Sequence, residues 1–170
     1  ALTQVAETFM KVEQPQLAQQ ATELAFQAAQ SLESWDWDGK INALTQVAIA
    51  FANTEQPGLA FQTAQSLKSW DDRINALSQV AIVFANTEQT KLTQRATVQA
   101  FQAAQAIEEA SIKFKALMQV TETFMKAEQP QLAQQATELA FQTAQSLESW
   151  NDKINALTQV AETFMKVEQP

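Results

Sequence analysis

The chain of 170 residues contains no cysteine and no histidine, and it has only two glycines and four prolines. Without these two side chains there is no thiol chemistry, no disulfide, no structural zinc site of the usual kind and no histidine acid–base catalysis. Scarce glycine beside 26 glutamines is typical of long helices and disfavours turn-rich sheets. We therefore expect an all-α protein.

Patterns that carry other catalytic chemistry are also missing. The acidic residues Glu7, Glu13, Glu23, Glu33 and Glu55 are scattered, and the sequence forces no two of them together as a catalytic carboxylate pair. There is no glycine-rich phosphate loop and no nucleophile elbow. We expect no enzyme, no catalytic residue, no cofactor and no metal.

The charge balance excludes two classes of partner. Eleven basic residues against 19 acidic ones give a net charge of -8, which repels nucleic acid and anionic membrane surfaces. No apolar run approaches the roughly 20 residues that span a bilayer. The chain starts at Ala1 and not at Met, so a leader could have been removed or the chain could be a fragment of a longer array. The sequence therefore predicts no particular cellular compartment.

A repeated segment organises the chain. ALTQVAETF opens at Ala1 and recurs with changes at Ala43, Ala76, Ala116 and Ala156, at spacings of 42, 33, 40 and 40 residues. Its apolar residues follow the spacing i, i+3, i+4, i+7, which predicts an amphipathic helix. We call this the first helix of each repeat. The predicted repeats of the single array over residues 1–170 are 1–42, 43–75, 76–115 and 116–155, with a half-repeat at 156–170.

A second helix follows in each complete repeat. Pro15, Pro57 and Pro130 stand where proline is tolerated, in the first turn of a helix, so they predict its start. In the second repeat this helix loses seven residues, nearly two turns, so its apolar stripe keeps its phase. At the junction to the next repeat, Ser69 and Ser149 precede an acid by three residues, the spacing of a serine cap.

The first helix carries the residues of a known family. Leu44, Val47, Ala48 and Phe51, followed nine residues on by Ala60, resemble the helix-turn-helix unit of tetratricopeptide-like repeats. This resemblance implies a right-handed α-solenoid of antiparallel helix hairpins, about four hairpins and a terminal half-repeat. It further implies a non-catalytic scaffold that mediates protein–protein interaction and binds proteins or extended peptides on its concave face.

The residues of that face lie on the first helices, off the core stripe. The candidate concave binding face consists of Asn42, Thr45, Ile49, Asn75, Ser78 and Ile82, and the fourth repeat adds Lys115, Met118, Glu122 and Met125. Apolar patches with polar rims are a sign of binding sites. Alternatively, Ile49 and Ile82 simply pack against neighbouring helices.

Three further patterns favour structural explanations. Lys40 and Asn42 resemble a carboxylate clamp, but residues i and i+2 lie about 200° apart on a helix and cannot converge on one ligand. Residues 34–45 partly fit a calcium loop, yet Ser34 and Thr45 stand where it needs acids, so we expect a capping loop with Gly39 in a turn.

The tryptophans at repeat junctions predict indoles packed between successive hairpins, with a ligand platform as the alternative. They are Trp35, Trp70 and Trp150.

The two ends of the chain are related. Residues 1–15 recur unchanged at 156–170. An end helix of a stacked array needs a cover, and the last one is no more polar than its internal copies. We therefore predict head-to-tail self-association into a filament or ring, unless the chain is cut from a longer array. The candidate contact residues are Leu2, Val5, Phe9, Leu157, Val160 and Phe164. The alternative function is thus a self-assembling structural protein with no foreign ligand.

Overall fold

The computed structural model describes residues 2–32 and 37–167, and within them it holds nine helices and no strand. In chain order these are α1 (Leu2–Lys11), α2 (Pro15–Ser31), α3 (Trp37–Asn53), α4 (Pro57–Gln65), α5 (Trp70–Asn86), α6 (Thr90–Gln105), α7 (Ala110–Lys126), α8 (Pro130–Gln145) and α9 (Trp150–Val167). The prediction of an all-α protein is confirmed. No helix among the described residues is long and apolar enough to cross a bilayer.

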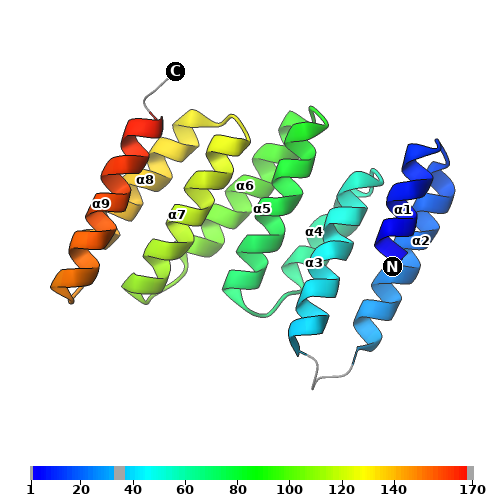
Figure 1. Ribbon diagram of the computed structural model, residues 1–170, viewed down its shortest axis with the longest axis horizontal. Coiled ribbons are helices and arrows are strands. Elements are labelled where there is room, and N and C mark those ends of the chain that lie inside the picture. The colour runs from blue at the N-terminus through cyan, green and yellow to red at the C-terminus, as the bar shows by residue number, and fades with distance from the viewer. Residues whose placement is uncertain (1, 33–36, 168–170) are drawn as a thin grey trace. The chain divides into compact units, whose positions relative to one another are not determined.

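Residues 1–96 and 97–170 form two compact units, and the division falls within α6. In the first unit α1, α3 and α5 form one layer, while α2 packs on α1 and α3, and α4 packs on α3 and α5 (Figure 1). In the second unit α8 packs on α7 and α9, which also touch each other. These contacts between neighbouring helices fit a helical repeat.

The turn from each first helix to the second has the same unusual conformation in every repeat. The second residue after the helix is a glutamate with positive φ, at Glu13 (57°), Glu55 (59°), Glu88 (58°) and Glu128 (54°). The next backbone N–H, that of a glutamine, donates to the phenylalanine carbonyl five residues back at 2.8–2.9 Å. This is the Schellman arrangement, in which a left-handed residue, usually glycine, satisfies carbonyls at a helix end.

The predicted helix starts and the predicted shortening are confirmed. α2, α4 and α8 begin at Pro15, Pro57 and Pro130, where the missing N–H has no intrahelical partner to lose. α4 has nine residues against 16 in α8, a difference of seven. The deletion therefore removes length from the helix itself.

Small and aromatic side chains alternate in the core. Alanines such as Ala18, Ala60 and Ala133 are completely buried, so the helix backbones approach closely. Between them pack three phenylalanine pairs with ring centroids 5.7–5.8 Å apart. The pairs are Phe26 with Phe51, Phe61 with Phe84, and Phe101 with Phe124.

Several threonine hydroxyls within the core bond to their own helices. The hydroxyls of Thr22, Thr121 and Thr137 are fully buried, and each donates to the carbonyl four residues earlier at 2.7–2.9 Å. The core therefore admits polar atoms without leaving these hydroxyls unpaired.

Basic side chains cap the second helices at the junctions between repeats. The Nζ of Lys40 donates to the carbonyls of Gln30 and Leu32 at 3.0 Å, and the guanidinium of Arg73 donates to the Leu67 carbonyl at 3.0 and 3.2 Å. Cations are favourable at helix C-termini, where carbonyls lack partners. Lys40 and Arg73 therefore each tie one repeat to the end of the previous one.

Serine capping differs between two junctions. The backbone N–H of Asp152 donates to the Ser149 hydroxyl at 3.4 Å, as the sequence predicts. Ser69 is the N-cap of α5 but makes no such side-chain cap bond. Its hydroxyl instead bonds the Asp72 carboxylate. Burial and the nearby charges of Asp71 and Asp38 raise the pKa of Asp72, and the hydrogen bond from Ser69 lowers it by less. The net pKa of Asp72 is raised.

Two expectations for the junctions are wrong. Gly39 lies inside α3 and has no positive φ, so it is not a turn residue. Trp150 is 76% exposed, so its indole is not packed between hairpins. Trp70 is half-buried. Trp35 and its neighbours Ser34 and Asp36 in the calcium-like loop lie outside the described residues.

Candidate protein-binding surfaces

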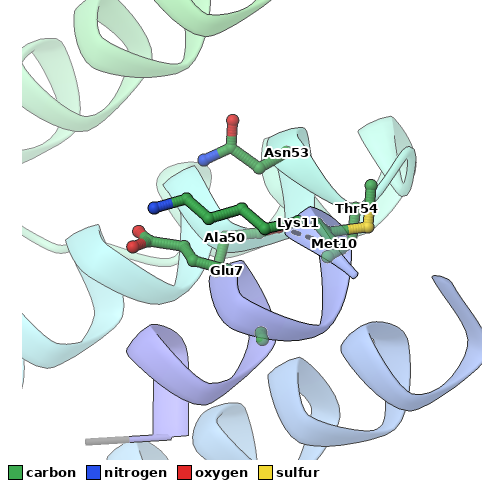
Figure 2. Close-up of a pocket in the computed structure, with 7 residues that line it drawn as sticks. Glu7, Met10, Lys11, Ala50, Asn53 and Thr54 are labelled. Atoms are coloured by element: carbon green, nitrogen blue, oxygen red, sulfur yellow. Dashed lines mark hydrogen bonds between the residues drawn. The ribbon is translucent and has the colours of Figure 1, made fainter. Parts of the chain in front are cut away.

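A groove runs between the first helices of successive repeats in the first unit. Figure 2 shows it between α1 and α3, with the side chains of Glu7, Lys11 and Asn53 over it. The groove has a volume of about 240 Å³, and Ala6, Met10, Ala50 and Thr54 complete its lining. We call it the α1–α3 groove. It combines a flexible apolar methionine with charges of both signs, a combination suited to protein surfaces that adapt to their ligand.

The second unit repeats this groove between α7 and α9. Its volume is about 550 Å³, and α7 contributes Glu122, Met125 and Lys126 at the positions that Glu7, Met10 and Lys11 hold in α1. Met118, Gln119, Thr163 and Lys166 complete its lining. We call it the α7–α9 groove. The Lys126 Nζ lies 2.8 Å from Glu122 Oε1, and because both side chains are more than half exposed this ion pair is readily exchanged for a ligand.

The predicted concave face is only partly open. Asn42 and Asn75 are exposed. Ile49 and Ile82 are half-buried, and they stand at the repeat position that is Glu7 in α1 and Glu122 in α7. Thr45 and Ser78 are buried, so they offer no surface to a ligand. The middle first helices thus present isoleucine where α1 and α7 present glutamate.

The predicted self-association residues divide between the two units. In the first unit Leu2 and Val5 are 38% and 42% exposed, and Phe9 is half-buried. In the second unit Leu157 and Phe164 are half-buried, while Val160 is buried.

The two end helices expose opposite sides. α1 buries Ala6 and exposes Val5, whereas α9 buries Val160 and exposes Ala161, the residues at the same two positions. The open side of α9 is an apolar stripe at helical spacing, which we call the α9 stripe: Trp150, Ile154, Leu157, Ala161 and Met165. In the internal helix α5 the matching residues Ile74, Leu77 and Ala81 are fully buried. The same repeated sequence is therefore uncovered on opposite sides in α1 and α9.

A pocket missed by the sequence reasoning lies beside the start of α1. It has a volume of about 400 Å³ and is lined mainly by apolar atoms of α1, α2 and α3. We call it the α1 pocket, and its lining is Leu2, Thr3, Ala25, Ala28, Ala29, Leu32, Asn42, Ala43, Gln46 and Val47.

Comparison with known proteins supports the fold. No family model matches the sequence, and no curated protein matches it either. The crystal structure of Ton1535 from Thermococcus onnurineus NA1 is similar, with a TM-score of 0.62 and 16% identity over 98% of this chain and 47% of that one. The chain thus spans about half the length of that protein. At this identity the similarity extends to the all-helical fold alone.

The described residues offer no ready metal site. Among them, no three histidine, cysteine, aspartate or glutamate side chains lie close enough together to hold an ion. The candidate binding surfaces among the described residues are the two grooves, the α9 stripe and the α1 pocket.

Proposed function

We propose that the chain is a non-catalytic scaffold of tetratricopeptide-like repeats, a right-handed α-solenoid, that binds a protein or an extended peptide through its first helices. The observation that carries this proposal is the recurrence of one groove, with the same glutamate, methionine and lysine, between first helices in both units. Side chains that served only to pack one helix against the next would not need a glutamate and a lysine at the same two positions of both grooves. The net charge of -8 disfavours nucleic acid and membrane lipids as ligands.

A displayed library of random peptides tests the binding function. We expect peptides selected on the native chain to lose at least about tenfold in affinity on the double variant Met10→Asp and Met125→Asp, because a buried carboxylate replaces an apolar contact in each groove. Affinities are measured by fluorescence anisotropy of the selected peptides.

The matched control is the double variant Gln20→Asp and Gln135→Asp, which adds the same two charges at exposed sites on α2 and α8. Equal affinity of both double variants for the peptides, or failure of the library to yield a binder, would contradict the proposal.

A second candidate is a self-assembling structural protein, a filament or ring subunit with no foreign ligand. The α9 stripe and the open side of α1 favour it, because Leu2, Val5 and Ala161 are exposed whereas their counterparts in the first helices α3, α5 and α7 are buried. Head-to-tail contacts between unlike surfaces produce rings when they close and filaments when they do not.

Light scattering behind a sizing column tests this candidate. Over a tenfold range of concentration we expect the molar mass to rise above 18.8 kDa. A constant mass of 18.8 kDa throughout the range would rule self-assembly out.

A further inference from the structure

Sulfur is confined to a few positions of the chain. There is no cysteine, so the only sulfur atoms are those of Met10, Met118, Met125 and Met165. Met10 lines the α1–α3 groove, and Met118 and Met125 line the α7–α9 groove. Met165 stands in α9 at the repeat position of Met10 and Met125. The sulfur chemistry of this protein is therefore largely the chemistry of its two grooves.

The hydrophobic core is built without methionine. All four methionines lie among the described residues, and none of them is buried. The three that line the grooves are half-buried, so part of each side chain is accessible to a small molecule in solution. A chemical change at these sulfur atoms therefore alters the grooves and leaves the core intact.

Packing between first helices does not require methionine at these positions. At the repeat position of Met10 and Met125, α3 has Ala52, which is buried, and α5 has Ala85, which is half-buried. Methionine occurs at this position only in α1, α7 and α9, which also carry the glutamate and the lysine of the grooves. The thioether therefore belongs with the charged residues of the grooves and not with the packing of the repeat.

A thioether can be oxidised reversibly to a sulfoxide. With hydrogen peroxide the O–O bond breaks, one oxygen bonds to the sulfur and the other leaves as water, and the sulfur loses the two electrons that the peroxide gains. The product is polar where methionine is flexible and apolar, a change that disrupts methionine-rich interfaces. Oxidation would thus remove the apolar part of each groove and leave its glutamate and lysine unchanged.

We propose that oxidation of Met10, Met118 and Met125 by peroxide switches off ligand binding in the two grooves. This inference rests on the proposed peptide-binding function and names its regulation. A ligand that packs an apolar group against the thioether loses this contact when a sulfoxide takes its place. Sulfoxide reductases return the sulfur to the thioether, so the switch is reversible.

Affinities measured before and after oxidation test the switch. The protein carries Met165→Leu, so its only methionines are those of the grooves, and the ligands are library-selected peptides without methionine, cysteine or tryptophan. After peroxide treatment and removal of the oxidant, mass spectrometry locates the sulfoxides and fluorescence anisotropy gives the affinity. We expect a loss of at least about tenfold, restored by methionine sulfoxide reductases.

The matched control adds Met10→Leu, Met118→Leu and Met125→Leu to the same protein. Leucine is apolar but has no sulfur, so the affinity of this variant, whatever its starting value, should change by less than about twofold on the same treatment. Urea unfolding is followed in parallel. The midpoint of the protein with oxidised grooves should be unchanged, because no methionine lies in the core.

The outcomes separate the switch from the binding function. If the library yields binders but oxidation leaves their affinity unchanged, or the leucine variant loses as much, the switch is wrong and the binding function stands. A lower unfolding midpoint after oxidation, or resistance of the three methionines to peroxide, would also overturn the switch. If the library yields no binder, the switch and the proposed function are wrong together.

Discussion

Phe84→Ala should destabilise the protein by about 3–5 kcal/mol, the usual cost of emptying a buried phenylalanine site. Phe84 is completely buried in α5, and its ring lies 5.8 Å from that of Phe61. Because folded domains are stable by only about 5–15 kcal/mol, this variant should lose a large part of its stability. The measurement is urea unfolding followed by far-UV circular dichroism.

The control for this prediction is Phe164→Ala, at the same position of the last repeat. Phe164 is half-buried, so its loss should cost about half as much or less. Both variants are measured at one low concentration, where association does not add to stability. Equal midpoint shifts would show that burial in the middle of the array does not determine the stability.

Replacing the four left-handed glutamates by glycine should raise stability by roughly 2–4 kcal/mol in total. A non-glycine residue in this conformation costs about 1–2 kcal/mol, which glycine avoids. The greater flexibility of glycine in the unfolded chain offsets about 0.5–1 kcal/mol of that gain at each site. The sites Glu13, Glu55, Glu88 and Glu128 are exposed, and each ends a separate helix, so their effects should approximately add. The measurement is the unfolding midpoint of the quadruple variant.

The quadruple alanine variant separates conformation from charge. It removes the same four carboxylates but keeps the Cβ atoms that cause the strain, so we expect little stabilisation from it. If the alanine and glycine variants gain equally, relief of charge repulsion and not backbone conformation explains the effect.

The sequence was sufficient to predict the helices, and for a physical reason. Each apolar stripe repeats at helical spacing, and proline marks the start of α2, α4 and α8, so local signals and the repeat period agree. The left-handed turns were not predicted, because glycine or asparagine normally marks them and glutamate carries no such signal.

The candidate surfaces were predicted less completely. Helical spacing identifies a face, but not which of its edges a neighbour covers, so Thr45 and Ser78 were assigned to an open face although they are buried. Val5 and Val160 have identical sequence surroundings and opposite burial. Their environments differ in which helices lie beside them, and no local pattern records that difference.

The short helix α4 has a consequence for how such a chain can change in evolution. Each residue of a helix turns the following side chains by about 100°, so a single deletion would rotate the buried Ala60, Phe61 and Ala64 out of register. Removing seven residues returns them to nearly the same direction. Repeats of this protein can therefore gain or lose helix length in steps of two turns, and intermediate lengths would be eliminated as misfolded.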